Sequence, residues 1–94
     1  KPAPDAALAA EVATLAGGAQ KLAERARAIA DGGDLRLACH LVEMASQADP
    51  ADRAVHAIRR DIYDVRRKAE LSLMAKGIYG FAAEESARAA GENE

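Results

Sequence analysis

Few of the side chains in this chain could bind a metal ion, and they are badly spaced for it. The candidates are Cys39, His40 and His56, whereas a zinc site takes three or four His, Cys or carboxylate ligands close together. Cys39 and His40 are neighbours that point about 100° apart on a helix, so they are poor co-ligands. We predict a small buried thiol at Cys39, a partly exposed His40, and a surface or interface position for His56.

The residues that could perform acid–base or nucleophilic chemistry do not form a site either. Glu84 and Glu85 are adjacent and point to different faces, while Asp61 and Asp64 alternate with arginines, which predicts a solvated ionic face. No serine lies in a Gly-x-Ser-x-Gly elbow or near a histidine in the sequence; the serines considered are Ser46, Ser72 and Ser86. The two Gly-Gly pairs read as helix stops rather than phosphate loops. We therefore predict no catalytic residue.

One basic cluster occurs, and acidic residues dilute it. Its members are Arg59, Arg60, Arg66, Arg67 and Lys68. Tyr63 is the only aromatic residue among them, and the chain carries a net charge of −2, whereas nucleic-acid-binding domains are strongly basic. We predict a solvated face or an ionic contact with a protein partner, and no nucleic-acid binding.

The element that would have to position any such residues is clearest in the stretch GDLRLACHLVEMASQADPAD, residues 33–52. Asp34 can cap a helix. The apolar face of that helix is formed by Ala38, Val42 and Ala45 at three- and four-residue spacings. Pro50 forces the residue before it out of helical geometry and ends the helix. This spacing resembles the second helix of a tetratricopeptide-type helix pair, which is a protein-binding unit.

The rest of the chain also predicts helices, so the fold class is all-α. We expect a short antiparallel array of about five helices, arranged as tetratricopeptide-like pairs. The expected helices, with their apolar stripes, are 4–16 (Leu8, Val12, Leu15), 19–31 (Leu22, Ala26, Ile29), 34–48, one from near 51 capped by Asp49 or Asp52 (Val55, Ile58, Ile62, Val65, Ala69), and a last one to about 90. A break is expected within 68–73. Gly77 and Gly80 mark either a bend or a close helix crossing.

Composition sets the limits of the core. Half of the 94 residues are hydrophobic but only 3% are aromatic, and alanine supplies about half of the hydrophobic fraction. Since an alanine buries about one methyl group, the core is thin, which suggests that a partner adds stability. No apolar run approaches the length of a membrane span. A single cysteine fits a reducing compartment and favours the cytoplasm. The start KPAPDAALAA resembles an interdomain linker, and we expect a fragment of a larger protein.

Two blocks together carry a family resemblance. They are LAERARAIADGGDLRLACHLVEMASQADPAD and DIYDVRRKAELSLMAKGIYGFAAEES. In this order they resemble the dimerisation domain of the alkyl sulfatases, which are zinc-dependent hydrolases of the metallo-β-lactamase superfamily. The resemblance covers residues 17–90 and implies a dimerisation-type domain there. From the residues themselves we expect a linker and first helix over 1–16 and a frayed tail over 91–94. The resemblance also implies that zinc binds an HxHxDH-type motif in a neighbouring hydrolase domain, with no cofactor in this chain.

The resemblance and the composition together favour a non-catalytic domain that pairs with a second copy of itself. In a two-fold dimer one patch is used twice. We expect the patch to comprise large apolar residues of the last helical region, namely Leu71, Met74, Ile78, Tyr79 and Phe81, with Leu8, Val12 and Leu15 as a second choice. The alternative is a freestanding helix-repeat adaptor that binds an external protein or peptide.

Overall fold

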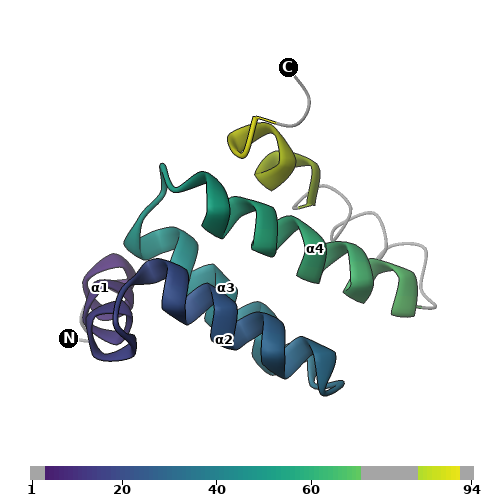
Figure 1. Ribbon diagram of the computed structural model, residues 1–94, viewed down its shortest axis with the longest axis horizontal. Coiled ribbons are helices and arrows are strands. Elements are labelled where there is room, and N and C mark those ends of the chain that lie inside the picture. Colours follow the sequence, from purple (N-terminus) through teal and green to yellow (C-terminus); the bar gives the residue numbers. More distant parts are fainter. Residues whose placement is uncertain (1–3, 71–82, 92–94) are drawn as a thin grey trace.

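The computed structural model describes residues 4–70 and 83–91, and these form five helices with no strand. The four longer ones are α1 (Asp5–Ala16), α2 (Ala19–Asp31), α3 (Leu35–Ala48) and α4 (Arg53–Ala69). A shorter helix covers residues 83–89 and is called the C-terminal segment below. The all-α prediction is confirmed (Figure 1).

Side-chain caps and left-handed glycines set the ends of these helices. The carboxylates of Asp34 and Asp52 accept hydrogen bonds from the backbone N–H groups of Leu37 and Val55, both at 3.1 Å, and so cap α3 and α4. Asp52, and not Asp49, is therefore the cap of α4. Gly17 ends α1 with a φ of +99°, which only glycine adopts readily.

The helix boundaries follow the predictions with small shifts. The helices expected over 4–16 and 34–48 each begin one residue later, because Pro4 and Asp34 are the capping residues. Helix α4 begins at Arg53 rather than near 51, after its cap. The expected break within 68–73 is confirmed, since α4 ends at Ala69 and Glu70 is extended.

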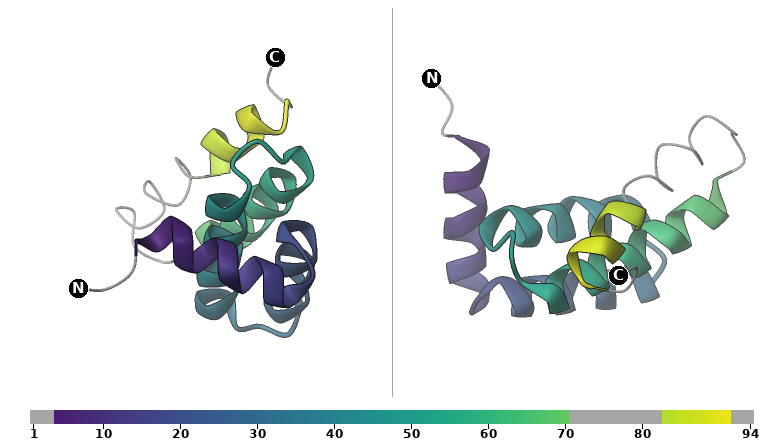
Figure 2. Two further views of the ribbon diagram at one scale, coloured as in Figure 1. Left: turned by 90° about the vertical axis from the view of Figure 1, so that its left-hand side faces the viewer. Right: turned by 90° about the horizontal axis from the view of Figure 1, so that it is seen from above.

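Helices α2 and α3 form a hairpin around a short glycine turn, and α4 packs against both of them (Figure 1). Helix α1 contacts α2 and α3 and lies across one end of this pair, as both views of Figure 2 show. The C-terminal segment lies over α4, on the side away from α2. It buries Ala83, Ser86 and Ala87, which share one helical face.

The core consists of small residues, as the composition predicts. The expected inward faces of α2 and α3 are confirmed, and five of their residues are fully buried: Ala23, Ala26, Ala38, Val42 and Ala45. Helix α4 adds three members of its predicted stripe, Val55, Ile58 and Ile62. Because alanine faces carry no bulky side chains, the α2 and α3 backbones can approach closely.

The last two members of the α4 stripe were predicted wrongly. The side chain of Val65 is 51% exposed, because the step from Ile62 moves it toward the edge of the inward face. Ala69 is exposed too, because the last turn of α4 lies beside an open pocket instead of the core.

Candidate functional site

Helix α1 turns its largest apolar side chains away from the core. Ala9 and Ala13 are buried, whereas Leu8 is 49% and Leu15 is 87% exposed. Val12 packs partly against the core. The three residues of the predicted stripe do lie on this helix, but two of them face outward. Such side chains do no chemistry, and their position suits contact with another apolar surface.

A small cavity opens beside one of these leucines, between α1 and α3. Its volume is about 210 Å³. Its lining residues are Asp5 and Leu8 of α1 and His40, Glu43, Met44 and Gln47 of α3. His40 is exposed at its edge, as predicted. Two of the lining residues, Leu8 and Met44, are apolar and the other four are polar, with Asp5 and Glu43 acidic.

The interface residues predicted from the last helical region lie outside the residues that the structure describes. They are Leu71, Met74, Ile78, Tyr79 and Phe81. They therefore stay a prediction, as does the choice between a bend and a helix crossing at Gly77 and Gly80. Of the predicted surface, only the second choice on α1 can be placed.

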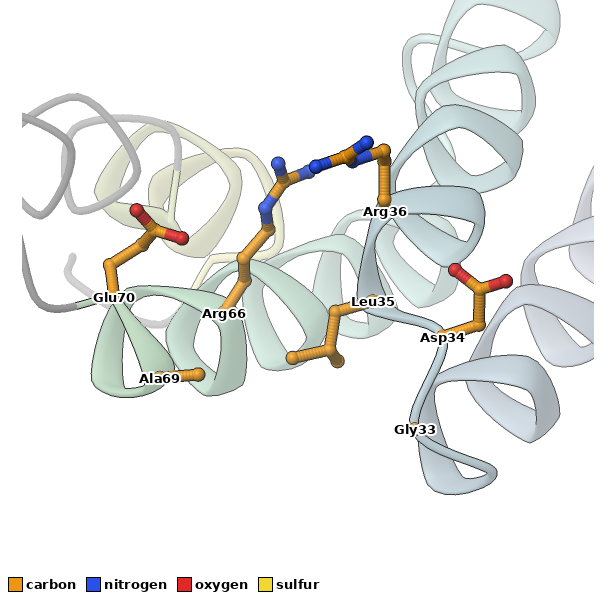
Figure 3. Close-up of a pocket in the computed structure, with 7 residues that line it drawn as sticks. All are labelled: Gly33, Asp34, Leu35, Arg36, Arg66, Ala69 and Glu70. Carbon is orange, nitrogen blue, oxygen red and sulfur yellow. The ribbon is translucent and has the colours of Figure 1, made fainter.

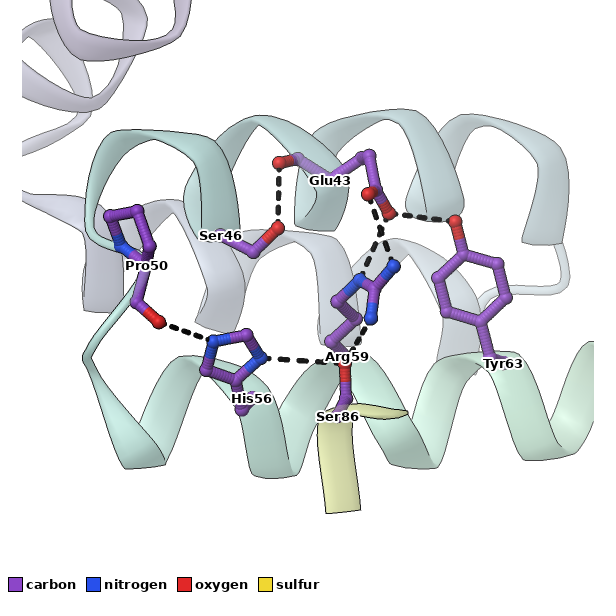
Figure 4. Close-up of polar contacts among 7 residues, drawn as sticks. All are labelled: Glu43, Ser46, Pro50, His56, Arg59, Tyr63 and Ser86. Atoms are coloured by element: carbon purple, nitrogen blue, oxygen red, sulfur yellow. Dashed lines mark hydrogen bonds and ion pairs between the residues drawn. The ribbon is translucent and has the colours of Figure 1, made fainter. Parts of the chain in front are cut away.

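One member of the predicted basic cluster, Arg59 at the centre of α4, is buried and not solvated (Figure 4). Arg59 is only 7% exposed. Its guanidinium donates two hydrogen bonds to the Glu43 carboxylate, at 3.0 and 3.1 Å, and a third to the hydroxyl of Ser86. The prediction of a solvated face was wrong for Arg59, because the C-terminal segment covers it.

The charges of this network depend on one another. Burial acts to lower the pKa of Arg59, but the hydrogen bond and charge of Glu43 outweigh it, and the pKa ends above its usual value. Burial, followed by a 2.8 Å hydrogen bond to Glu43, raises the pKa of Tyr63. Arg59 also lies 5.0 Å from the centre of the Tyr63 ring. Arg59 therefore stays cationic and Tyr63 neutral, and together they fix α4 against α3.

His56 bridges the α3–α4 turn to the C-terminal segment. Its Nε2 lies 2.7 Å from the carbonyl oxygen of Pro50, which can only accept, so this nitrogen donates. In the neutral ring Nδ1 then accepts from the Ser86 hydroxyl at 3.4 Å. His56 was predicted on the surface or in an interface, and it is instead a partly buried internal contact.

The Ser86–His56 contact is one that sequence reasoning missed. The two residues are 30 positions apart, so nothing in the local sequence could reveal it. A serine beside a histidine is one element of nucleophilic catalysis. Ser86 is fully buried, however, and its oxygen accepts from Arg59, so no substrate can reach it. The network attaches the C-terminal segment to α4.

A second, wider pocket lies at the opposite end of the hairpin (Figure 3). It has a volume of about 540 Å³, and it is lined by Gly33, Asp34, Leu35, Arg36, Arg66, Ala69 and Glu70. Asp34 is engaged in capping α3. The pocket combines two arginines with two acids, and no convergent set of donors identifies a ligand.

The described part of the chain offers no metal centre. Over residues 4–70 and 83–91, no group of three or more His, Cys, Asp or Glu side chains is placed to hold a metal ion. Cys39 is buried as predicted. Nor does any helix in these ranges have both the length and the apolar character needed to cross a membrane.

Comparison with known proteins assigns the chain. The model of one protein family, described as alkyl sulfatase dimerisation, matches residues 1–89. Searches of the curated proteins and of the solved structures give no match. The matched range includes all four long helices and the whole C-terminal segment. The chain therefore belongs to the alkyl sulfatase dimerisation family, and its role is self-association.

Proposed function

We propose that this chain forms a two-fold homodimer and is the self-association domain of a larger zinc-dependent hydrolase of the alkyl sulfatase type. The observation that carries the proposal is the family match over residues 1–89. Zinc and catalysis would then belong to a neighbouring domain with an HxHxDH-type motif.

The thin core supports a homodimer on physical grounds. Burying a methylene contributes about 0.8 kcal/mol and a whole large apolar side chain about 1.5–3 kcal/mol. Over residues 4–70 and 83–91, eight of the fourteen buried hydrophobic residues are alanines: Ala9, Ala13, Ala23, Ala26, Ala38, Ala45, Ala83 and Ala87. A domain of this size buries a smaller share of its surface than a large one does. Pairing with a second copy adds the apolar contact that a single copy lacks.

The interface that we propose includes the predicted residues of the last helical region. Leu71, Met74, Ile78, Tyr79 and Phe81 are large apolar residues of that region, and glycines permit a close backbone approach. The variant Phe81→Glu tests this part. It should convert the dimer to a monomer that keeps its helical content. If it lowers the melting temperature and leaves the dimer intact, Phe81 belongs to the core.

Sedimentation velocity of the chain at micromolar concentration tests self-association directly. We expect a species of twice the chain mass that dissociates on dilution. A monomer at all concentrations would contradict the homodimer and favour the freestanding adaptor. The parent enzyme is tested separately by reading the coding sequence on both sides of this chain. An HxHxDH-type motif on the N-terminal side is expected, and a complete coding sequence without one would overturn the hydrolase.

A further inference from the structure

Helix α1 exposes apolar side chains that no other part of the described chain covers. Its inward positions hold two alanines, and its two leucines face outward. The helix has only two charged residues, Asp5 and Glu11. A helix that is apolar nearly all round is normally buried on most sides. In Figure 2, α1 stands at one edge of the molecule with the other helices on one side of it.

The shape of this surface is complementary to itself. Leu15 projects from the end of α1, and the 210 Å³ cavity opens beside Leu8 at the start of the same helix. In a two-fold interface the same patch meets itself, so a projection and a cavity on one patch can each be filled by the other copy. An antiparallel pair of α1 helices brings Leu15 of each copy to the cavity beside Leu8 of the other.

Charge complementarity favours the same register. When Leu15 faces Leu8 of a second copy, Asp5 of that copy faces the turn after α1. Lys21, in the first turn of α2, is exposed beside this turn, and its Cγ lies 3.6 Å from the position that a Cβ on Gly17 would occupy. Antiparallel helices also align their dipoles favourably. The register thus pairs Asp5 with Lys21 at each end, and it brings the two exposed Glu11 side chains to one solvent-facing edge near the two-fold axis.

The size of the helix limits how much of the interface it can form. With 12 residues, α1 is about 18 Å long and about 10–12 Å wide. Its footprint of roughly 200 Å² is well below the ~800 Å² per partner of a standard stable interface. The α1 pair therefore forms one part of the dimer contact, in addition to any contribution from the last helical region.

We infer that α1 is a homodimerisation element that packs antiparallel against α1 of a second copy, with Leu15 seated in the cavity beside Leu8. This inference rests on the proposed homodimer and specifies its partner surface.

A matched pair of variants tests the surface. Leu15→Glu places a carboxylate in the cavity beside Asp5 and Glu43 of the other copy, and it removes two buried leucines per dimer. We expect a dimer roughly a hundredfold weaker. Thr14→Glu is the control, since Thr14 is exposed in the same helical turn but points about 100° away. It should leave dimer affinity within about threefold. Circular dichroism should show both variants folded.

Engineered disulfides test the register. In a Cys39→Ala background, Leu8→Cys and Leu15→Cys are combined and the chain is oxidised. The two positions lie about 10.5 Å apart in one helix, beyond the ~7 Å limit for a disulfide, so any bond must join two copies. We expect a covalent dimer from the double variant and none from either single variant.

The outcomes separate this inference from the proposed homodimer. A monomeric wild-type chain overturns both. A wild-type dimer that Leu15→Glu does not weaken leaves the homodimer standing and overturns the α1 contact. A covalent dimer from Leu15→Cys alone, or none from the double variant, overturns the antiparallel arrangement.

Discussion

At the scale of single residues, the most consequential feature is the buried polar network around Arg59. A buried charge is costly unless it is paired and hydrogen-bonded, and Arg59 satisfies its donors with Glu43 and Ser86. Within the described residues, no buried side-chain nitrogen or oxygen lacks a partner. Substituting any one member should therefore lower the stability of the fold, because the remaining groups would lose their partners inside the protein.

Ser86→Ala tests this cost. The substitution removes an acceptor from Arg59 and a donor to His56 at a fully buried position, which should destabilise the fold by about 1–3 kcal/mol. Ser46→Ala is the matched control, because Ser46 is also buried but bonds only the Glu43 carbonyl of its own helix, at 2.9 Å. Urea unfolding followed by circular dichroism measures both. Equal effects of the two variants would show that the network adds no stability.

Asp52 should make stability depend on pH. Its carboxylate accepts from the Gln20 side chain at 2.9 Å and from the Val55 N–H at 3.1 Å, and these bonds lower its pKa below the ordinary 3.8. A carboxyl group with a lowered folded pKa stabilises above its unfolded pKa and loses that contribution as pH falls through the folded value.

The change that isolates this effect is Asp52→Asn, which keeps a capping oxygen and removes the charge. At about pH 6 it should lower the stability by a few tenths to about 1 kcal/mol, and near pH 2 the difference should vanish. Thermal unfolding measures it. Gln20→Ala is the companion variant, and it should reduce the pH dependence of the wild type. A difference that is the same at both pH values would exclude Asp52 as the source.

At the scale of elements, the two glycines of the turn between α2 and α3 have different backbone conformations. The sequence presents Gly32 and Gly33 as equivalent helix stops. In the structure Gly32 is right-handed, with a φ of −79°, while Gly33 has a φ of +101°. Only Gly33 occupies a backbone region that disfavours other residues, so it alone reverses the chain into the hairpin.

Gly33→Ala should therefore cost about 1–2 kcal/mol of stability. Nothing lies within 4 Å of the Cβ that it adds, so the cost comes from the backbone and not from a clash. Gly32→Ala provides the control. Its Cβ meets backbone oxygens at 3.4 Å or more, and it should be neutral or stabilise slightly. Denaturant midpoints compare the two. A Gly32 variant as damaging as the Gly33 variant would contradict this division.

Helix α1 shows how an element can have the right pattern and the wrong orientation. The spacing of Leu8, Val12 and Leu15 indicates an apolar stripe, yet the helix buries Ala9 and Ala13. Nearly every residue of α1 is apolar, so periodicity cannot select one face. The close approach of α1 to α2 and α3 decides it, because small side chains fit there and leucines do not.

At the scale of the whole molecule, a small alanine-rich core coexists with an exposed apolar flank. Membership of the alkyl sulfatase dimerisation family explains why apolar surface stays exposed on a single chain. A domain that functions by pairing need not bury its largest side chains internally. The single chain has a Cα radius of gyration of 12.9 Å, which is close to the ~13 Å of a compact domain of this size.

The sequence by itself determined the all-α class, the boundaries of the four long helices to within about two residues, the Asp34 cap of α3, and the inward faces of α2 and α3. These follow from local propensity, capping chemistry and a 3.6-residue period. Only the tertiary structure decided that Arg59 is buried, that His56 meets Ser86, and that α1 turns its leucines outward. Each of these depends on how helices distant in the sequence come together, and no local pattern records that.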